Sequence, residues 1–141
     1  ADEALVRGGT GKAPTPLDYF MMGTGFGIGT QAVMSAKAIG FQLDHFEIDV
    51  ETAYDTRGKH RLGDLFVGQL WFKYWLNIHS SETPSRARQL IYHVERHCRT
   101  TNTLRHPVRL IPHVIVNERD IGFSLPKQPT PEDVRAERGV Q

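Results

Sequence analysis

The sequence contains one cysteine, Cys98, in 141 residues. It therefore cannot form an intramolecular disulfide, which excludes a secreted domain stabilised by disulfides. No apolar run approaches the roughly 18 to 20 residues that a membrane-spanning helix needs, and no signal peptide is recognisable. We expect a cytoplasmic protein that does not associate with a membrane.

The sequence also lacks a charge excess, because 17 Lys and Arg face 16 Asp and Glu for a net charge of +1. A protein without a strong positive field does not attract nucleic acid by electrostatics, and its aromatic residues are not interleaved with cations. We therefore expect no nucleic-acid partner. The hydrophobic fraction of 39% and charged fraction of 23% are ordinary for one globular domain.

The segment from Pro16 to about Ile39 is predicted to be a helix that ends at Gly40. Four alternate positions within it are glycines, each costing about 1 kcal/mol relative to alanine: Gly23, Gly25, Gly27 and Gly29. Such a helix is stable only when close neighbours surround it. The glycines also leave room for a ligand or a partner.

Alternating apolar and polar residues predict three strands. Residues 45–54 have one acidic, solvent-facing side, and the turn of residues 55–58 follows them. A second strand, at about 65–79, carries Trp71 and Trp75 on the face opposite its other apolar residues, which suggests that a partner covers it. The third strand spans Pro107 to Val116, with Pro112 at an edge or a bulge.

A second helix is predicted from the N-cap Thr83 to about Cys98. Its apolar stripe places Cys98 at the end of the buried face. His93 and His97 are spaced i, i+4 and are weak candidates for metal ligands, but His93 and Cys98 diverge around the helix. Surface histidines are the preferred interpretation, so we expect no metal and no cofactor.

These elements predict an α+β fold in which two packed helices, the first long, central and rich in glycine, lie against an antiparallel sheet. We divide the chain into an N-terminal arm at residues 1–15, a domain at 16–116 and a C-terminal tail at 117–141.

Two motifs resemble the OsmC/Ohr family, over about residues 14–116. Pro16-Leu-Asp-Tyr-Phe-Met-Met-Gly is similar to the start of that family's first long helix, in the branch that reads Pro-x-Asp. His97-Cys-Arg-Thr-Thr-Asn-Thr-Leu104 is similar to its second cysteine motif, Cys-Pro-x-Ser-Asn-x-Leu. The resemblance implies an intertwined homodimer with active sites at the subunit interface. It also implies reduction of hydroperoxides by a peroxidatic cysteine on the first helix and a resolving cysteine at the end of the second.

The chain departs from that pattern at the position that matters most for the chemistry. Gly27 stands where the resemblance places the peroxidatic cysteine, while Cys98 matches the resolving one and is followed by Arg99 in place of proline. Asp18 matches the Pro-x-Asp branch, although Leu17 stands where an acidic residue often follows the proline. The activating arginine of Ohr-type members has no good counterpart, since Arg7 is a poor substitute. Two-cysteine turnover is therefore not expected.

Two functional hypotheses remain open. The first is a thiol-dependent reductase that uses Cys98 alone. The alternative interpretation of Cys98 is a buried apolar residue that has only a packing role. It lies at a helix C-terminus, where the helix dipole raises the pKa of a thiol. The second is a non-catalytic or repurposed subunit that binds an apolar ligand or another protein chain in a groove near Asp18, Gly23, Gly25 and Gly27. In both cases we expect a homodimer, with completion of the sheet by another chain as the alternative.

Overall fold

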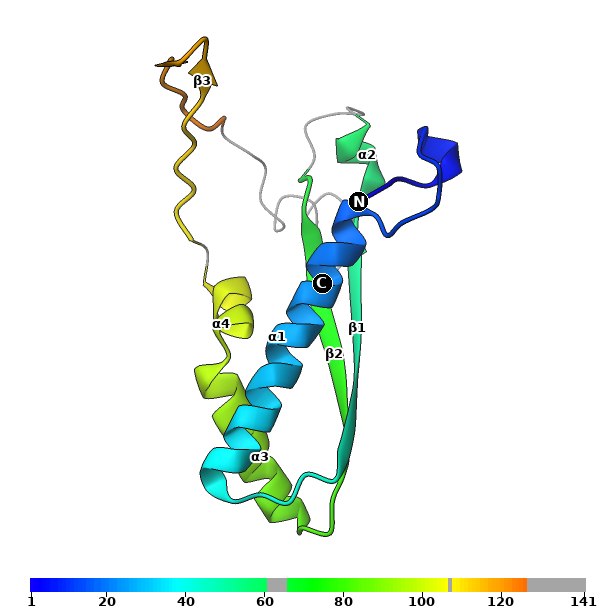
Figure 1. Ribbon diagram of the computed structural model, residues 1–141, viewed down its shortest axis with the longest axis vertical. Helices are drawn as coiled ribbons and strands as arrows, with labels where there is room; N and C mark the ends of the chain where they lie inside the picture. Colours follow the sequence, from blue (N-terminus) through cyan, green and yellow to red (C-terminus); the bar gives the residue numbers. More distant parts are fainter. Residues whose placement is uncertain (61–65, 107, 127–141) are drawn as a thin grey trace, which may run out of the picture. The chain divides into compact units, whose positions relative to one another are not determined.

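The computed structural model describes residues 1–60, 66–106 and 108–126. In chain order its elements are a 3-10 helix η1 (Leu5–Arg7), α1 (Pro16–Ile39), β1 (His45–Tyr54), α2 (Thr56–Lys59), β2 (Gln69–His79), α3 (Pro84–His97), α4 (Arg99–Arg105), β3 (Ile115–Val116) and β4 (Arg119–Asp120). They form two compact units, Ala1–Glu51 with Lys73–Pro107 and Thr52–Phe72 with Val108–Gln141. Figure 1 shows the elements.

Helix α1 has the bounds that the sequence predicts because both of its ends are capped. The hydroxyl of Thr15 accepts a hydrogen bond from the amide of Asp18, and the Asp18 carboxylate accepts one from the amide of Thr15, which completes a capping box. At the other end Gly40 has a φ of 62° and donates its amide to the carbonyls of Ala36 and Lys37. This left-handed conformation favours glycine and stops the helix.

Strands β1 and β2 form a two-stranded sheet. The amide of Asp44 donates to the carbonyl of His79, and the hydroxyl of Thr52 donates to the carbonyl of Trp71. The strands therefore run antiparallel, because a later residue of β1 pairs with an earlier residue of β2. Alternate residues of β2 are half-buried, and Trp71 and Trp75, at 36% and 47% exposed, lie on the other face. The predicted alternation is confirmed, and the predicted cover over the two tryptophans stays a prediction.

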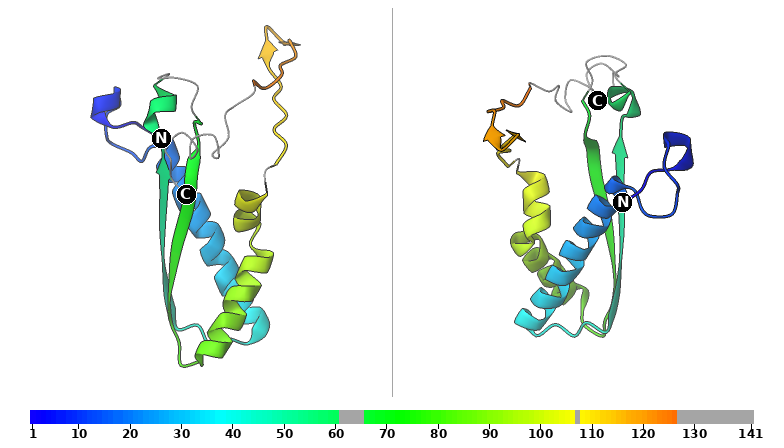
Figure 2. Two further views of the ribbon diagram at one scale, coloured as in Figure 1. Left: turned by 180° about the vertical axis from the view of Figure 1, so that it is seen from behind. Right: turned by 45° about the horizontal axis from the view of Figure 1, so that its top comes forward.

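Helix α3 begins after the predicted N-cap Thr83, whose hydroxyl accepts from the amide of Arg86, and it ends at the predicted place. It packs against α1 in the first unit, with the sheet on another side of α1 (Figures 1 and 2). The buried apolar core of the described residues comprises Ile28, Ala32, Ala36, Phe41, Leu90, Val94 and Cys98. Partly buried residues of the sheet, among them Ile48, Leu76 and Ile78, pack against this core.

The predicted third strand is wrong for most of its length. Residues 108–114 form no strand, position 107 lies outside the described residues, and only Ile115–Val116 is extended and paired, with Arg119–Asp120. Asn117 and Glu118 have positive φ values of 48° and 65°, as a tight hairpin turn requires. Pro112 lacks an amide donor, and no strand among the described residues pairs with residues 108–114, so this alternating segment is irregular.

Two smaller differences concern polar segments. The turn expected at 55–58 is a single helical turn, α2 (Thr56–Lys59). Just before it, the Asp55 carboxylate accepts a hydrogen bond from the amide of Arg57 at 3.0 Å and forms an ion pair with the Arg57 guanidinium at 2.8 Å. Helix α4 was not predicted, because its threonine-rich sequence carries no apolar periodicity. The predicted tail is described only to residue 126.

Candidate functional site

The glycines of α1 face different neighbours. A Cβ atom at Gly25 would lie 3.1 Å from a methyl group of Val50, and one at Gly29 would lie 3.3 Å from the ring of Phe46, both on β1. A Cβ at Gly23 would meet nothing within 4 Å. Gly25 and Gly29 therefore let the helix approach the sheet closely, which is the close packing that the sequence predicts.

Gly27 faces α4. A Cβ built there would overlap the hydroxyl oxygen of Thr100 and would lie 3.1 Å from the Thr100 Cβ. The space that the resemblance assigns to a cysteine side chain is thus occupied from the other side by Thr100. Gly27 thus faces α4, Gly25 faces the sheet, and Gly23 has open space beside it, so the three glycines predicted to form a groove do not face one common space.

Asp18 acts in the cap of α1. Its carboxylate accepts hydrogen bonds from the hydroxyl and the amide of Thr15, each at 2.8 Å. The hydroxyl of Thr15 and then its amide lower the pKa of Asp18, because both donate to the charged form. The described contacts of this residue are therefore those of a helix cap.

Cys98 is 1% exposed and lies in the core with Leu90 and Val94, as its place on the apolar stripe predicts. It is the C-cap residue of α3 and the N-cap residue of α4, so the two helices meet at this position. Its carbonyl accepts hydrogen bonds from the side-chain amide of Asn102 at 2.8 Å, the backbone amide of Asn102 at 3.1 Å and the hydroxyl of Thr101 at 3.3 Å. The motif from Cys98 to Asn102 thus has a structural role, since it holds the bend between two helices.

A second set of contacts braces the same bend and was missed by sequence reasoning. The carboxylate of Glu95 on α3 accepts hydrogen bonds from the Tyr74 hydroxyl of β2 and from the Arg105 guanidinium of α4. Asn102 also donates to the carbonyl of Glu95 at 3.3 Å. Three elements meet at one carboxylate, and no motif in the sequence signals such a convergence.

His93 and His97 stack with ring centroids 5.8 Å apart and an interplanar angle of 16°. His97 Nδ1 donates to the carbonyl of His93 at 2.9 Å. Cys98 is buried while His97 is exposed, so the cysteine does not join the pair. Over residues 1–60, 66–106 and 108–126, no three His, Cys, Asp or Glu side chains are grouped to hold a metal ion.

A hollow of about 260 Å³ opens beside Gly27, between the first half of α1 and α4. Its lining residues are Phe20, Thr24, Arg99, Thr100, Thr103 and Leu104. None of the six is acidic, and one is a cation. The hydroxyl of Thr24 donates to the carbonyl of Phe20, and that of Thr103 donates to the carbonyl of Arg99, both at 2.9 Å. Sequence reasoning identified Gly27 but not its threonine-rich neighbours.

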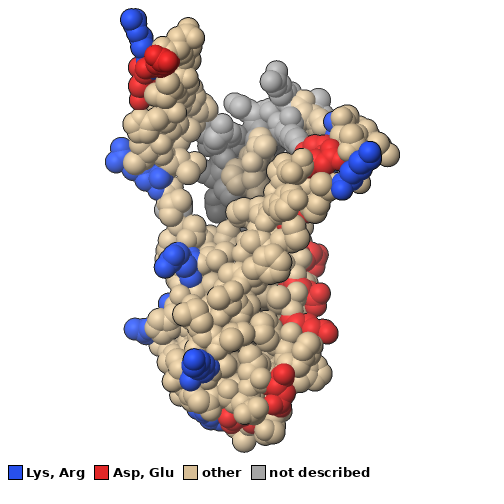
Figure 3. Space-filling model, viewed as in Figure 1, with Lys and Arg blue, Asp and Glu red and all other residues tan. Residues whose placement is uncertain are grey.

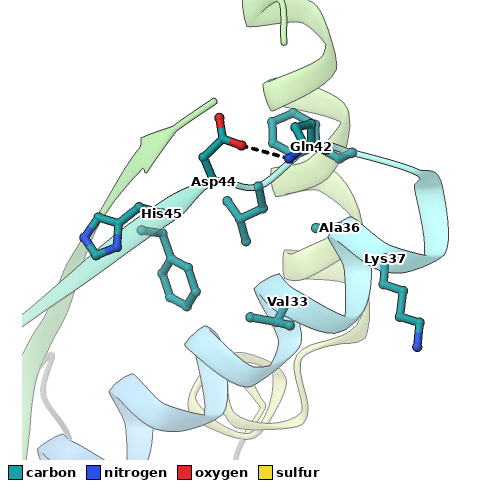
Figure 4. A pocket seen from close by; sticks show the side chains of 9 residues that line it. Val33, Ala36, Lys37, Gln42, Asp44 and His45 are labelled. Atoms are coloured by element: carbon teal, nitrogen blue, oxygen red, sulfur yellow. Dashed lines mark hydrogen bonds between the residues drawn. The ribbon is translucent and has the colours of Figure 1, made fainter. Parts of the chain in front are cut away.

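A larger depression of about 470 Å³ lies where α1 turns into β1 (Figure 4). Val33 and Ala36 of α1 border it, and the Lys37 side chain points away from it. On its rim the side-chain amide of Gln42 donates to the Asp44 carboxylate at 2.8 Å. This shallow surface brings together no set of side chains with evident chemistry.

The family model described as OsmC-like protein matches residues 9–112. Among solved structures, the chain is similar to an OsmC-like protein from Mycoplasma pneumoniae, with 20% identity, a TM-score of 0.62, and coverage of 70% of this chain and 67% of the other. An OsmC-like hydroperoxide resistance protein from Jannaschia sp. CCS1 has 20% identity and a TM-score of 0.61, with coverage of 86% and 75%. The organic hydroperoxide resistance protein OsmC from Legionella pneumophila has 18% identity and a TM-score of 0.52, with coverage of 74% and 71%.

No curated protein matches the chain. These identities support the fold alone, which is the α+β arrangement that the sequence predicts. Within the described part of the chain, no helix combines the length and the apolarity that crossing a membrane requires.

Proposed function

Because the chain belongs to the OsmC-like protein family, we propose that it keeps the family fold without the two-cysteine reduction of hydroperoxides, and that it binds a small ligand in the hollow beside Gly27. The observation that carries this proposal is the pair formed by Gly27 and Thr100. The resemblance places the attacking thiolate at position 27, and here a threonine hydroxyl fills that space.

The remaining thiol supports the same proposal. A thiolate that attacks a peroxide must be reachable, whereas Cys98 is 1% exposed and packs among apolar side chains. Its neighbours Val94 and Leu90 resemble those of an inert structural cysteine. We therefore assign Cys98 a packing role and the bend between α3 and α4.

Peroxide consumption tests the absence of thiol chemistry. Wild type and Cys98→Ser are incubated with cumene hydroperoxide and excess dithiothreitol, and the loss of peroxide is followed over time. We expect the same rate for both proteins, equal to the rate without protein. A faster rate for wild type than for Cys98→Ser would establish a one-cysteine reductase and overturn this part of the proposal.

We further propose that the protein is a homodimer in which a second copy covers the outer face of α1. That face carries Tyr19, Phe26, Val33 and Met34, which are 47%, 70%, 50% and 60% exposed. Figure 3 shows the surface over α1 as mostly uncharged, beside a row of acidic side chains where β1 runs. A contiguous apolar surface of this kind is typical of an interface.

A further inference from the structure

We propose that the hollow beside Gly27 is a site for a short-chain monocarboxylate, with Arg99 and Thr100 holding the carboxylate and Phe20 and Leu104 contacting the alkyl chain. This inference rests on the ligand-binding part of the proposed function and adds the chemical class of the ligand. It follows from the charge, the hydrogen-bonding state and the size of the lining.

Arg99 supplies a cation beside the hollow. Among the described residues no carboxylate forms an ion pair with its guanidinium, whereas Arg57, Arg86 and Arg105 each pair with an acidic side chain. The six residues around the hollow include no acidic one. A guanidinium left unpaired beside a hollow favours an anion, and its planar fork of donors suits a carboxylate.

Thr100 supplies the matching hydroxyl. Of the three threonines in the lining, Thr24 and Thr103 donate their hydroxyl protons to backbone carbonyls of their own helices. In the described part of the chain the Thr100 hydroxyl has no such acceptor, and it lies against Gly27 on the border of the hollow. It is therefore the hydroxyl in this hollow that can donate to a ligand.

The size and polarity of the hollow restrict the anion. Its volume of about 260 Å³ lies below the roughly 300 to 1,000 Å³ of sites for drug-sized ligands. A single cation suits a monoanion, since a dianion such as phosphate would keep an uncompensated charge. Phe20 and Leu104, which are 46% and 40% exposed, provide apolar surface for a short alkyl chain.

Titrations of the ¹⁵N-labelled full chain with hexanoate and with 1-hexanol, followed by amide chemical shifts, test the site. We expect saturable shifts at Thr100 and Thr103 and tighter binding of hexanoate than of hexanol. Arg99→Gln should weaken hexanoate binding about fivefold, as loss of a partly solvated charged hydrogen bond implies, and leave hexanol binding unchanged. Thr100→Val, which keeps the side-chain shape, should weaken hexanoate binding to a smaller extent.

Arg88→Gln is the matched control, because Arg88 is an exposed arginine of α3 outside the lining. Equal binding of hexanoate and hexanol would overturn the carboxylate assignment and leave the ligand-binding proposal standing. Equal losses in Arg99→Gln and Arg88→Gln would also overturn it, because the attraction would then be unspecific. Binding of neither probe would overturn the ligand-binding proposal as well, whereas the peroxide assay is independent of all these results.

Discussion

The two faces of α1 are similar in composition and opposite in environment. Ile28, Ala32 and Ala36 on the inner face are 0%, 1% and 3% exposed, while Phe26 and Met34 on the outer face are 70% and 60% exposed. A helix that is apolar all around is normally enclosed on all sides. The difference shows that the described part of the chain packs against one face of its central helix and leaves the other face exposed, which is the face that the proposed dimer would cover.

The glycines of the helix show the same contrast at finer scale. Gly27 is held against Thr100, whereas Gly23 has open space beside it. Three comparisons between variants test whether the inner contacts determine the stability and the outer residues determine the assembly.

The largest effect is expected for Leu90→Ala, which empties a fully buried position opposite α1. The free energy of unfolding should fall by about 3 kcal/mol, because the lost burial and the residual cavity add. Urea denaturation measures it. Arg88→Ala, an exposed change on the same helix, should alter stability by less than about 0.5 kcal/mol. A loss below about 1 kcal/mol at Leu90 would contradict the described core.

The next effect is expected for Phe26→Ser on the outer face. If a second copy covers this face, the change removes an aromatic anchor worth about 2 kcal/mol, and the dimer dissociation constant should rise about thirtyfold. Sedimentation velocity over a range of concentrations measures it. Tyr92→Ser, which changes a 60% exposed aromatic of α3, should leave the dimer intact. A monomeric wild type would refute the dimer.

The smallest effect compares Gly27→Ala with Gly23→Ala. Both substitutions gain up to about 1 kcal/mol in helix propensity. At Gly27 the new methyl group meets Thr100, and overpacking costs about 1 to 3 kcal/mol, so we expect net destabilisation by about 1 kcal/mol. Urea denaturation again provides the values. Adding Thr100→Ala should recover part of the loss, and equal stabilisation at both glycines would show that Thr100 does not hold this space.

Elements with strong local signals were predicted correctly. Helices α1 and α3 have capping threonines, prolines in the first turn and apolar residues at helical spacing, and β1 alternates from His45 to Thr52. The segment 107–116 alternates as well, yet most of its described residues are irregular. Alternation states only that a segment suits a sheet, and whether a neighbouring strand exists is a long-range property.

The candidate site was predicted in part. The apolar stripe of α3 placed Cys98 in the core, which the structure confirms, while the assignment of Gly27 to the position of the missing cysteine stays a prediction of the resemblance. The residue that occupies that space, Thr100, lies 73 positions further along the chain and has no local signature. The convergence of Tyr74 and Arg105 on Glu95 was likewise invisible in the sequence.

The sequence by itself determined the boundaries of α1 and α3, the burial of Cys98 and the absence of a second cysteine, because caps, periodicity and residue identity act over a few neighbouring residues. Tertiary structure alone decided that Thr100 fills the space at Gly27 and that Arg99 borders a hollow with no acidic side chain in its lining. The reason is physical: the approach of two helices depends on the packing of all the side chains between them, and no segment of the chain encodes that distance alone.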